Sequence, residues 1–145
     1  MLVLMKGIVK DFKTYCEKHG LRITPPRLHV LEIIAKSDKP LTAYDILDAL
    51  GGKLDKPKPP TAYRALEFLS EHGFIHRIES LNAYMVCHEN HKHDGGQFLI
   101  CDSCGAVEEI HLCSMPSSLQ EKVKTQGFTL HHWNVEVHGQ CQKCV

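Results

Sequence analysis

The chain has 145 residues, enough for one domain or two small ones, and its 43% hydrophobic content suffices for ordinary cores. Its formal net charge is zero, but residues 1–80 carry a net +3, whereas residues 81–145 carry −3 and seven of the eleven histidines. No apolar run approaches the roughly 20 residues of a membrane-spanning helix, and the apolar start before Lys6 is too short for a secretory signal. We therefore expect a cytoplasmic protein without a membrane partner, in which reduced cysteines bind metal.

Four helices are predicted before Gly73 from apolar periodicity and from helix start and stop signals. Thr24 precedes two prolines, a pattern typical of an N-cap and a first helical turn. Thr42 is the predicted N-cap of the third helix, which ends at the glycine pair 51–52. The fourth helix begins near Thr61, and its apolar side chains share one face: Ala62, Ala65, Leu66 and Leu69.

Two short β-prone runs, 74–78 and 83–86, follow the fourth helix and predict a β-hairpin. Helices followed by a hairpin are the order of a winged helix-turn-helix, in which the last helix reads DNA and the hairpin is the wing. The predicted elements of the second half are strands at 97–100, 107–112 and 128–138 and a helix at 117–126.

The predicted fold class is therefore α+β. A winged helix-turn-helix DNA-binding domain is expected over residues 1–83, and a small α/β dimerisation domain over residues 84–145. An exposed strand edge of the second domain is a natural surface for forming a homodimer.

Two Cys-x-x-Cys pairs, Cys101/Cys104 and Cys141/Cys144, predict a structural zinc site in the second half. Four thiolates complete the tetrahedral shell of zinc and leave no open position for water. A zinc hydrolase needs such an open position, so this pattern favours neither an enzyme nor a small-molecule substrate.

A second set of soft ligands surrounds the junction of the two predicted domains. His76 lies on the first wing strand, Cys87 follows the second, His91 and His93 lie in the next loop, and Glu109 lies on a later strand. Imidazole, thiolate and carboxylate together suit zinc. Each residue also has a purely structural interpretation, as a packed histidine, a buried cysteine or a solvated carboxylate, and a protein of that kind would hold a single zinc. Their clustering favours a second site, hence about two zinc ions per chain.

Several segments in the same order resemble the ferric-uptake-regulator (Fur) family of metal-dependent transcriptional repressors. The segments are RITPPR at 22–27, PTAYRAL at 60–66 and CDSCG at 101–105. FIHRIES at 74–80 and YMVCH at 84–88 resemble the zinc uptake regulator branch of that family.

The resemblance implies a regulatory zinc site formed by His76, Cys87, His93 and Glu109, with His91 as the alternative to His93. It implies a homodimeric repressor that binds double-stranded operator DNA when zinc is its co-repressor, and that controls zinc uptake genes. An iron- or peroxide-responsive regulator of the same fold is the alternative, although the thiolate of Cys87 argues against it. A further metal site is left open at three histidines: His91, His111 and His132.

The predicted DNA contacts lie on the third and fourth helices. Arg64 is expected to contact guanine with its two-pronged guanidinium group. Tyr44 and Tyr63 are expected to contact phosphate or a thymine methyl group, with packing between helices as the alternative for Tyr63. Four cations are expected near phosphates: Lys53, Lys56, Lys58 and Arg77.

Overall fold

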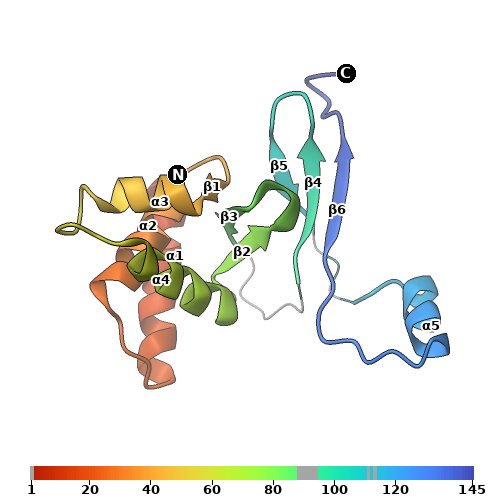
Figure 1. The fold of residues 1–145 in the computed structure, drawn as a ribbon, viewed down its shortest axis with the longest axis horizontal. Coiled ribbons are helices and arrows are strands. Elements are labelled where there is room, and N and C mark those ends of the chain that lie inside the picture. Colours follow the sequence, from red (N-terminus) through yellow and green to blue (C-terminus); the bar gives the residue numbers. More distant parts are fainter. Residues whose placement is uncertain (1, 88–94, 111, 113) are drawn as a thin grey trace. The chain divides into compact units, whose positions relative to one another are not determined.

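A computed structural model describes residues 2–87, 95–110, 112 and 114–145 (Figure 1). The chain divides into two compact units, residues 1–91 and residues 92–145. Helices and strands occur in both units, so the predicted α+β class is confirmed. None of the helices in the described part of the chain combines the length and hydropathy that crossing a membrane requires.

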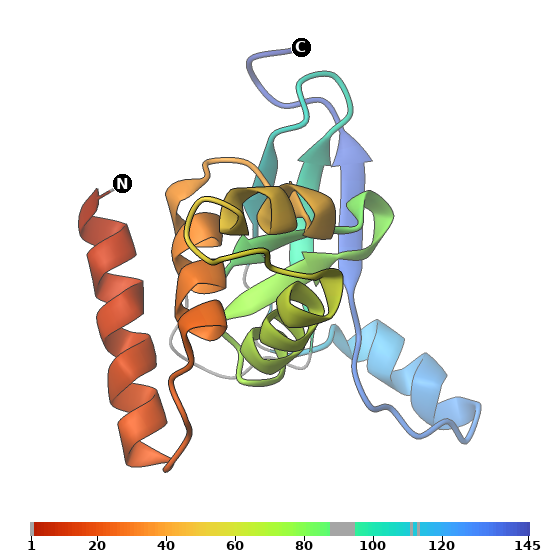
Figure 2. The same cartoon turned by 60° about the vertical axis from the view of Figure 1, so that its left-hand side comes forward.

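Two helices of the first unit begin directly after the predicted capping residues, Thr24 and Thr42. The Thr24 hydroxyl accepts a hydrogen bond from the backbone N–H of Arg27 at 3.4 Å. Thr42 and Asp45 form a reciprocal capping box, with hydrogen bonds of 3.2 and 3.1 Å between each side chain and the other residue's backbone N–H. The helix that Thr24 caps lies alongside the N-terminal helix (Figure 2). The four helices are α1 (Leu2–Lys18), α2 (Pro25–Lys36), α3 (Ala43–Leu50) and α4 (Pro59–Glu71).

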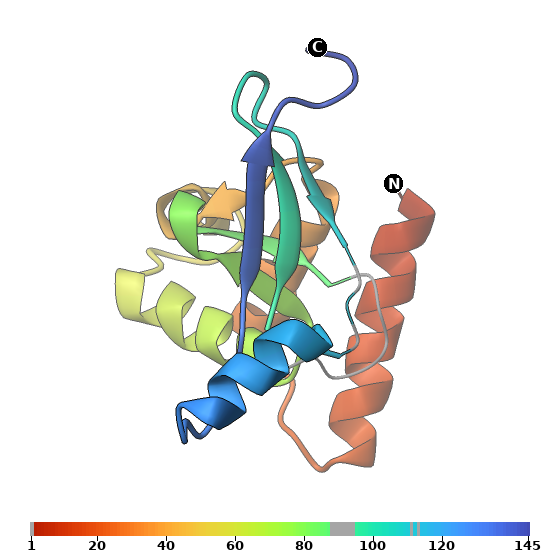
Figure 3. The same ribbon diagram turned by 90° about the vertical axis from the view of Figure 1, so that its right-hand side faces the viewer.

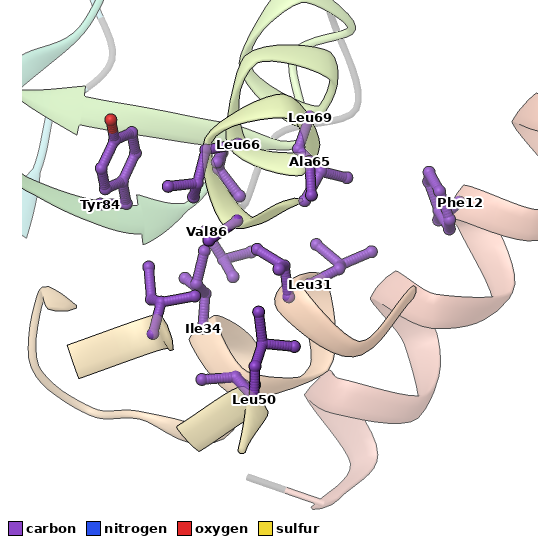
Figure 4. Close-up of a cluster of buried hydrophobic side chains, with 14 of the residues drawn as sticks. Phe12, Leu31, Ile34, Leu50, Ala65, Leu66, Leu69, Tyr84 and Val86 are labelled. Carbon is purple, nitrogen blue, oxygen red and sulfur yellow. The ribbon is translucent and has the colours of Figure 1, made fainter. Parts of the chain in front are cut away.

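The apolar faces of these helices form one core in the first unit (Figure 4). As predicted, α4 buries Ala62, Ala65, Leu66 and Leu69 in it. Burying such side chains stabilises the fold by about 1.5–3 kcal/mol for each large aliphatic residue. Because one face of α4 is buried, its opposite face is left for the solvent and for ligands.

A three-stranded antiparallel sheet completes the first unit. The predicted hairpin is present as β2 (Ile75–Ile78) and β3 (Ala83–Val86), joined by a 3₁₀ turn at Glu79–Leu81. The sequence did not predict the two-residue strand β1 (Leu41–Thr42), which pairs with β3. The compact unit that ends at residue 91 contains the whole hairpin, whereas the expected boundary after residue 83 falls inside β3, after its first residue.

The second unit contains a sheet with the strand order β5-β4-β6 (Figure 3). The central strand β4 (Gln97–Cys101) pairs antiparallel with β5 (Val107–Glu109) and parallel with β6 (Val135–Gly139). The parallel pairing requires a crossover, which contains α5 (Ser117–Thr125). The helix stands beyond the end of the sheet at which β6 begins (Figure 3).

The predicted strand at 128–138 is wrong over its first seven residues, since β6 begins only at Val135. Val135 pairs with Gln97, the first residue of β4, so residues 128–134 extend past the start of β4 and join no backbone ladder among the described residues. The alternating apolar pattern there does not reflect burial in this chain, because Phe128 is 68% exposed. The strand predicted at 107–112 is likewise shorter and ends at Glu109.

Candidate metal centres and DNA-binding surface

The four predicted thiolates converge within the second unit. Cys101 ends β4, and a turn closed by a hydrogen bond from the Gly105 N–H to the Cys101 carbonyl (2.9 Å) presents Cys104 beside it. Gly105 has φ +74°, which favours glycine at this position. Cys141 and Cys144 form a similar turn after β6, closed by a 2.9 Å bond from the Cys144 N–H to the Cys141 carbonyl.

The four Sγ atoms lie within 4.8 Å of one another. A zinc–sulfur distance of about 2.3 Å places neighbouring sulfurs of a tetrahedron about 3.8 Å apart. The Sγ atoms of Cys104 and Cys141 are separated by 3.7 Å, so the cluster already has the dimensions of a zinc tetrathiolate. The residues fit zinc, and with four sulfurs the shell is closed.

Further contacts, which the sequence did not indicate, join the two cysteine turns. The Asp102 N–H donates to the Gly139 carbonyl at 2.8 Å, continuing the pairing of β4 and β6 beyond the last bridge. The Gln140 amide donates to the Ser103 hydroxyl at 3.1 Å. The His138 Nδ1 atom lies 3.3 Å from Asp102 Oδ1. These contacts align the ligand turns before any metal binds.

The same geometry separates the pKa values of the thiols in the zinc-free chain. Hydrogen bonds from the backbone N–H groups of Cys141 and Cys104 lower the pKa of Cys101 from its ordinary value of 9.0 to about 6. The Cys141–Cys101 bond is 3.3 Å long. Hydrogen bonds to the other three thiols raise the pKa of Cys144 to about 12. Of Cys101 and Cys144, Cys101 is therefore the thiol that loses its proton at the lower pH.

Two of the predicted regulatory ligands are brought together on the wing. His76 pairs with Met85 in the β2–β3 register, so Cys87, two residues past Met85, is the diagonal neighbour of His76 on the same face of the sheet. The ligand atoms of His76 and Cys87 lie within 4.8 Å of each other. The Cys87 N–H donates to the Phe74 carbonyl at 3.0 Å, which holds the cysteine, itself buried, against the start of β2.

The other predicted ligands belong to the second unit or lie outside the described residues. Glu109 is the last residue of β5, half-buried, and opposite Phe98 in the register. His91 and His93 lie outside the described residues, and so does His111 of the possible further site. His132, the third histidine of that site, is exposed.

The predicted DNA contacts lie on the exposed faces of α3 and α4. Arg64 projects from α4 opposite the buried stripe and is exposed. Tyr44, at the start of α3, is 79% exposed, and Tyr63 is 56% exposed. Exposure of this extent speaks against the alternative in which Tyr63 packs between helices.

Two of the four expected phosphate contacts have protein partners. Lys53 Nζ lies 3.3 Å from a Glu32 carboxylate oxygen, and Arg77 lies 3.4 Å from Glu79 and donates to Asn82 at 2.9 Å. These pairs are partly exposed, so each contributes little to stability. They leave the cations accessible, but the charge of each is partly neutralised.

The sequence of the chain matches the model of the ferric uptake regulator family over residues 18–138. The chain belongs to the ferric uptake regulator family. A zinc uptake regulation protein of Escherichia coli (strain K12) is 42% identical over 132 residues, covering 90% of this chain and 77% of that protein. A peroxide operon regulator of Bacillus subtilis (strain 168) is 30% identical over 139 residues, covering 94% of this chain and 92% of that protein.

Solved structures of zinc regulators of the family have the same fold. A zinc uptake regulator complexed with zinc and DNA is 36% identical, has a TM-score of 0.89, and is matched over 96% of this chain and 93% of that one. The holo form of XcZur is 40% identical with a TM-score of 0.83, over 94% and 96% of the two chains. The winged helix and the small α/β unit are thus those of the Fur family.

Proposed function

We propose that this chain is a zinc-responsive DNA-binding repressor, with zinc as its co-repressor and zinc uptake genes as its targets. The observation that carries the proposal is the pairing of His76 with Cys87 on the wing of the unit whose α4 exposes Arg64. A pair of metal ligands and the proposed DNA-reading helix thus belong to the same compact unit. The 42% identical relative is itself a zinc uptake regulation protein, and members of the family regulate transcription rather than catalyse reactions.

The proposed regulatory site consists of His76 and Cys87 together with His93, or His91 in its place, and Glu109. Imidazole, thiolate and carboxylate form a donor set that suits zinc. When bound, zinc would supply a bond between the wing and the second unit. In a dimer, the two α4 helices would then have a narrower range of orientations relative to each other. Binding DNA would therefore cost less conformational entropy. By linkage, DNA must tighten zinc binding by the same factor by which zinc tightens DNA binding.

The second zinc, held by Cys101, Cys104, Cys141 and Cys144, is structural in this proposal. It clips the C-terminal turn to the end of β4 and stabilises the unit that we propose as the dimerisation domain. Two protomers would place their α4 helices at half-sites about 34 Å apart or a multiple of it, which is one turn of B-DNA. A repressor that binds operator DNA in this way would work in the cytoplasm.

The proposal is tested by measuring zinc content and DNA binding together. Operator DNA is first selected from a random duplex pool with the zinc-loaded protein. We expect about two zinc ions per chain, one of which is removed by mild chelation together with operator binding and restored with it by added zinc. One tightly held zinc and DNA binding that ignores chelation would refute the zinc-sensing function.

Variants locate the sensing site. His76→Ala and Cys87→Ser should each abolish the zinc dependence of operator binding and leave one zinc per chain. His131→Ala, which removes an exposed histidine of the second unit, is the matched control and should behave as the wild type. Repeating the assay with ferrous iron in anaerobic buffer tests the alternative signal, and stronger operator binding with iron than with zinc would favour an iron-responsive regulator.

A further inference from the structure

The guanidinium group of Arg27 connects the start of α2 to the recognition helix. Arg27 lies in the first turn of α2, where its backbone N–H is bound by the Thr24 cap. Its Nη1 atom donates to the Arg22 carbonyl at 2.6 Å. Its Cζ atom stands 3.7 Å from the centroid of the Phe68 ring on α4, within cation–π range. One side chain thus joins the α1–α2 turn, α2 and α4.

Arg27 also influences α1 electrostatically. Burial raises the pKa of the Cys16 thiol on α1, while the positive charge of Arg27 lowers it. In the described part of the chain, no carboxylate lies within 4.0 Å of the Arg27 guanidinium. Among the described residues, the guanidinium cation is therefore partnered by the Phe68 ring and not by a carboxylate.

Phe68 lies on the same side of α4 as the proposed base-reading residue. It follows Arg64 by four residues, and residues at this spacing are neighbours on one helix face. Phe68 is also packed edge-to-face on Phe12 of α1, with ring centroids 6.4 Å apart and planes at 83°. Arg27 thus covers the Phe68 ring one turn away from Arg64.

In the described part of the chain, the N-terminal half of α4 has few other contacts that would fix its orientation as strongly as a large buried side chain does. The first half of its buried stripe consists of Ala62 and Ala65, whose methyl groups fill little volume in the core. Its N-cap residue, Lys58, makes no side-chain capping hydrogen bond. A further contact lies at the far end of α4, where Tyr15 Oη is 3.0 Å from His72 Nδ1. The contact between Arg27 and Phe68 is closer to Arg64 along the helix than this one.

We infer that Arg27 is a positioning residue for operator recognition, which acts through Phe68 to set the angle at which α4 presents Arg64. The inference rests on the proposed function, because it concerns how the recognition helix is aimed at DNA. Arg27 contributes to the difference between operator and other DNA, and a side chain that merely neutralised a phosphate would strengthen both equally.

The test compares Arg27→Met, Arg27→Lys and Phe68→Leu with the wild type, all zinc-loaded. Affinity is measured for selected operator DNA and for a duplex of shuffled sequence at three salt concentrations, after circular dichroism has shown that each variant is folded. We expect Arg27→Met to lower operator affinity about 2- to 30-fold, the range of a cation–π contact, with the affinity for shuffled DNA nearly unchanged. Arg27→Lys, which retains the charge without the planar fork, should be intermediate.

Phe68→Leu separates positioning from direct DNA contact. If Arg27 acts through the ring, Arg27→Met should have little further effect on operator affinity in the Phe68→Leu background. A phosphate contact would instead lower both affinities equally and reduce the salt slope by about one in Arg27→Met, while Arg27→Lys would bind as the wild type. That result, or unchanged operator affinity in Arg27→Met, overturns the inference. A wild type that shows no zinc-dependent operator preference would instead refute the proposed function.

Discussion

Replacing Leu66 by alanine should lower the free energy of unfolding of the first unit. It tests whether packing in this core holds the recognition helix α4 in place. Leu66 is 1% exposed and belongs to the core cluster that includes Leu31, Ile34 and Val86 (Figure 4). The substitution removes three carbon atoms, which at about 0.8 kcal/mol each amounts to about 2.4 kcal/mol of transfer free energy. The cavity adds to this, so we expect the free energy of unfolding to fall by about 2–5 kcal/mol.

The two units can be followed separately during urea unfolding in excess zinc. Circular dichroism at 222 nm reports mainly on α1 to α4, all of which belong to the first unit. Trp133 is the single tryptophan of the chain, and its fluorescence reports on the second unit. With a slope of about 1.5 kcal/mol per molar urea, a loss of 3 kcal/mol lowers the dichroism midpoint by about 2 M. The fluorescence midpoint should move less.

Glu67→Ala is the matched control, because Glu67 is the next residue of α4 and is exposed. Its free energy of unfolding should stay within about 0.5 kcal/mol of the wild type. A loss below about 1 kcal/mol for Leu66→Ala would refute the packing argument. Equal shifts of the two midpoints would refute the separate unfolding of the two cores.

Three further predictions concern the caps, the thiolates and the DNA-reading helix. Thr42→Ala breaks the capping box with Asp45 and should lower the free energy of unfolding by about 1 kcal/mol in the same dichroism assay, whereas no loss would refute the role of the cap. The folded pKa of Cys101, about 6, lies below its ordinary 9.0, so its stabilisation of the zinc-free chain is fully present above pH 9 and is lost as the pH falls through 6. Between pH 9 and pH 6 the melting temperature of the zinc-free wild type should therefore fall more than that of zinc-free Cys101→Ser. Parallel plots of melting temperature against pH for the two proteins would contradict the lowered pKa of Cys101. Arg64→Ala should lower operator preference by about 1–3 kcal/mol in a gel-shift assay while zinc content and dimerisation stay unchanged, and unchanged preference would refute the base contact.

Local chemistry in the sequence was enough to predict the helices of the first unit and the ligand types. Thr24 and Thr42 cap their helices because a hydroxyl beside the first turn satisfies a backbone N–H whatever the remainder of the chain does. Each Cys-x-x-Cys pair likewise forms its own turn. The apolar stripe of α4 was readable because a helix repeats every 3.6 residues.

The long-range pairings of strands and side chains were decided only by the tertiary structure. The parallel register that sets Cys101 opposite Gly139 brings the two thiolate turns together, and the wing register makes His76 and Cys87 diagonal neighbours. Residues 128–134 have strand-like alternation but pair with no strand in the part of the chain that the structure describes. The contact of Arg27 with Phe68 joins residues far apart in the chain. A strand exists only where another strand completes its hydrogen bonds, and a contact between distant residues depends on how whole elements pack, so neither is encoded in any one segment.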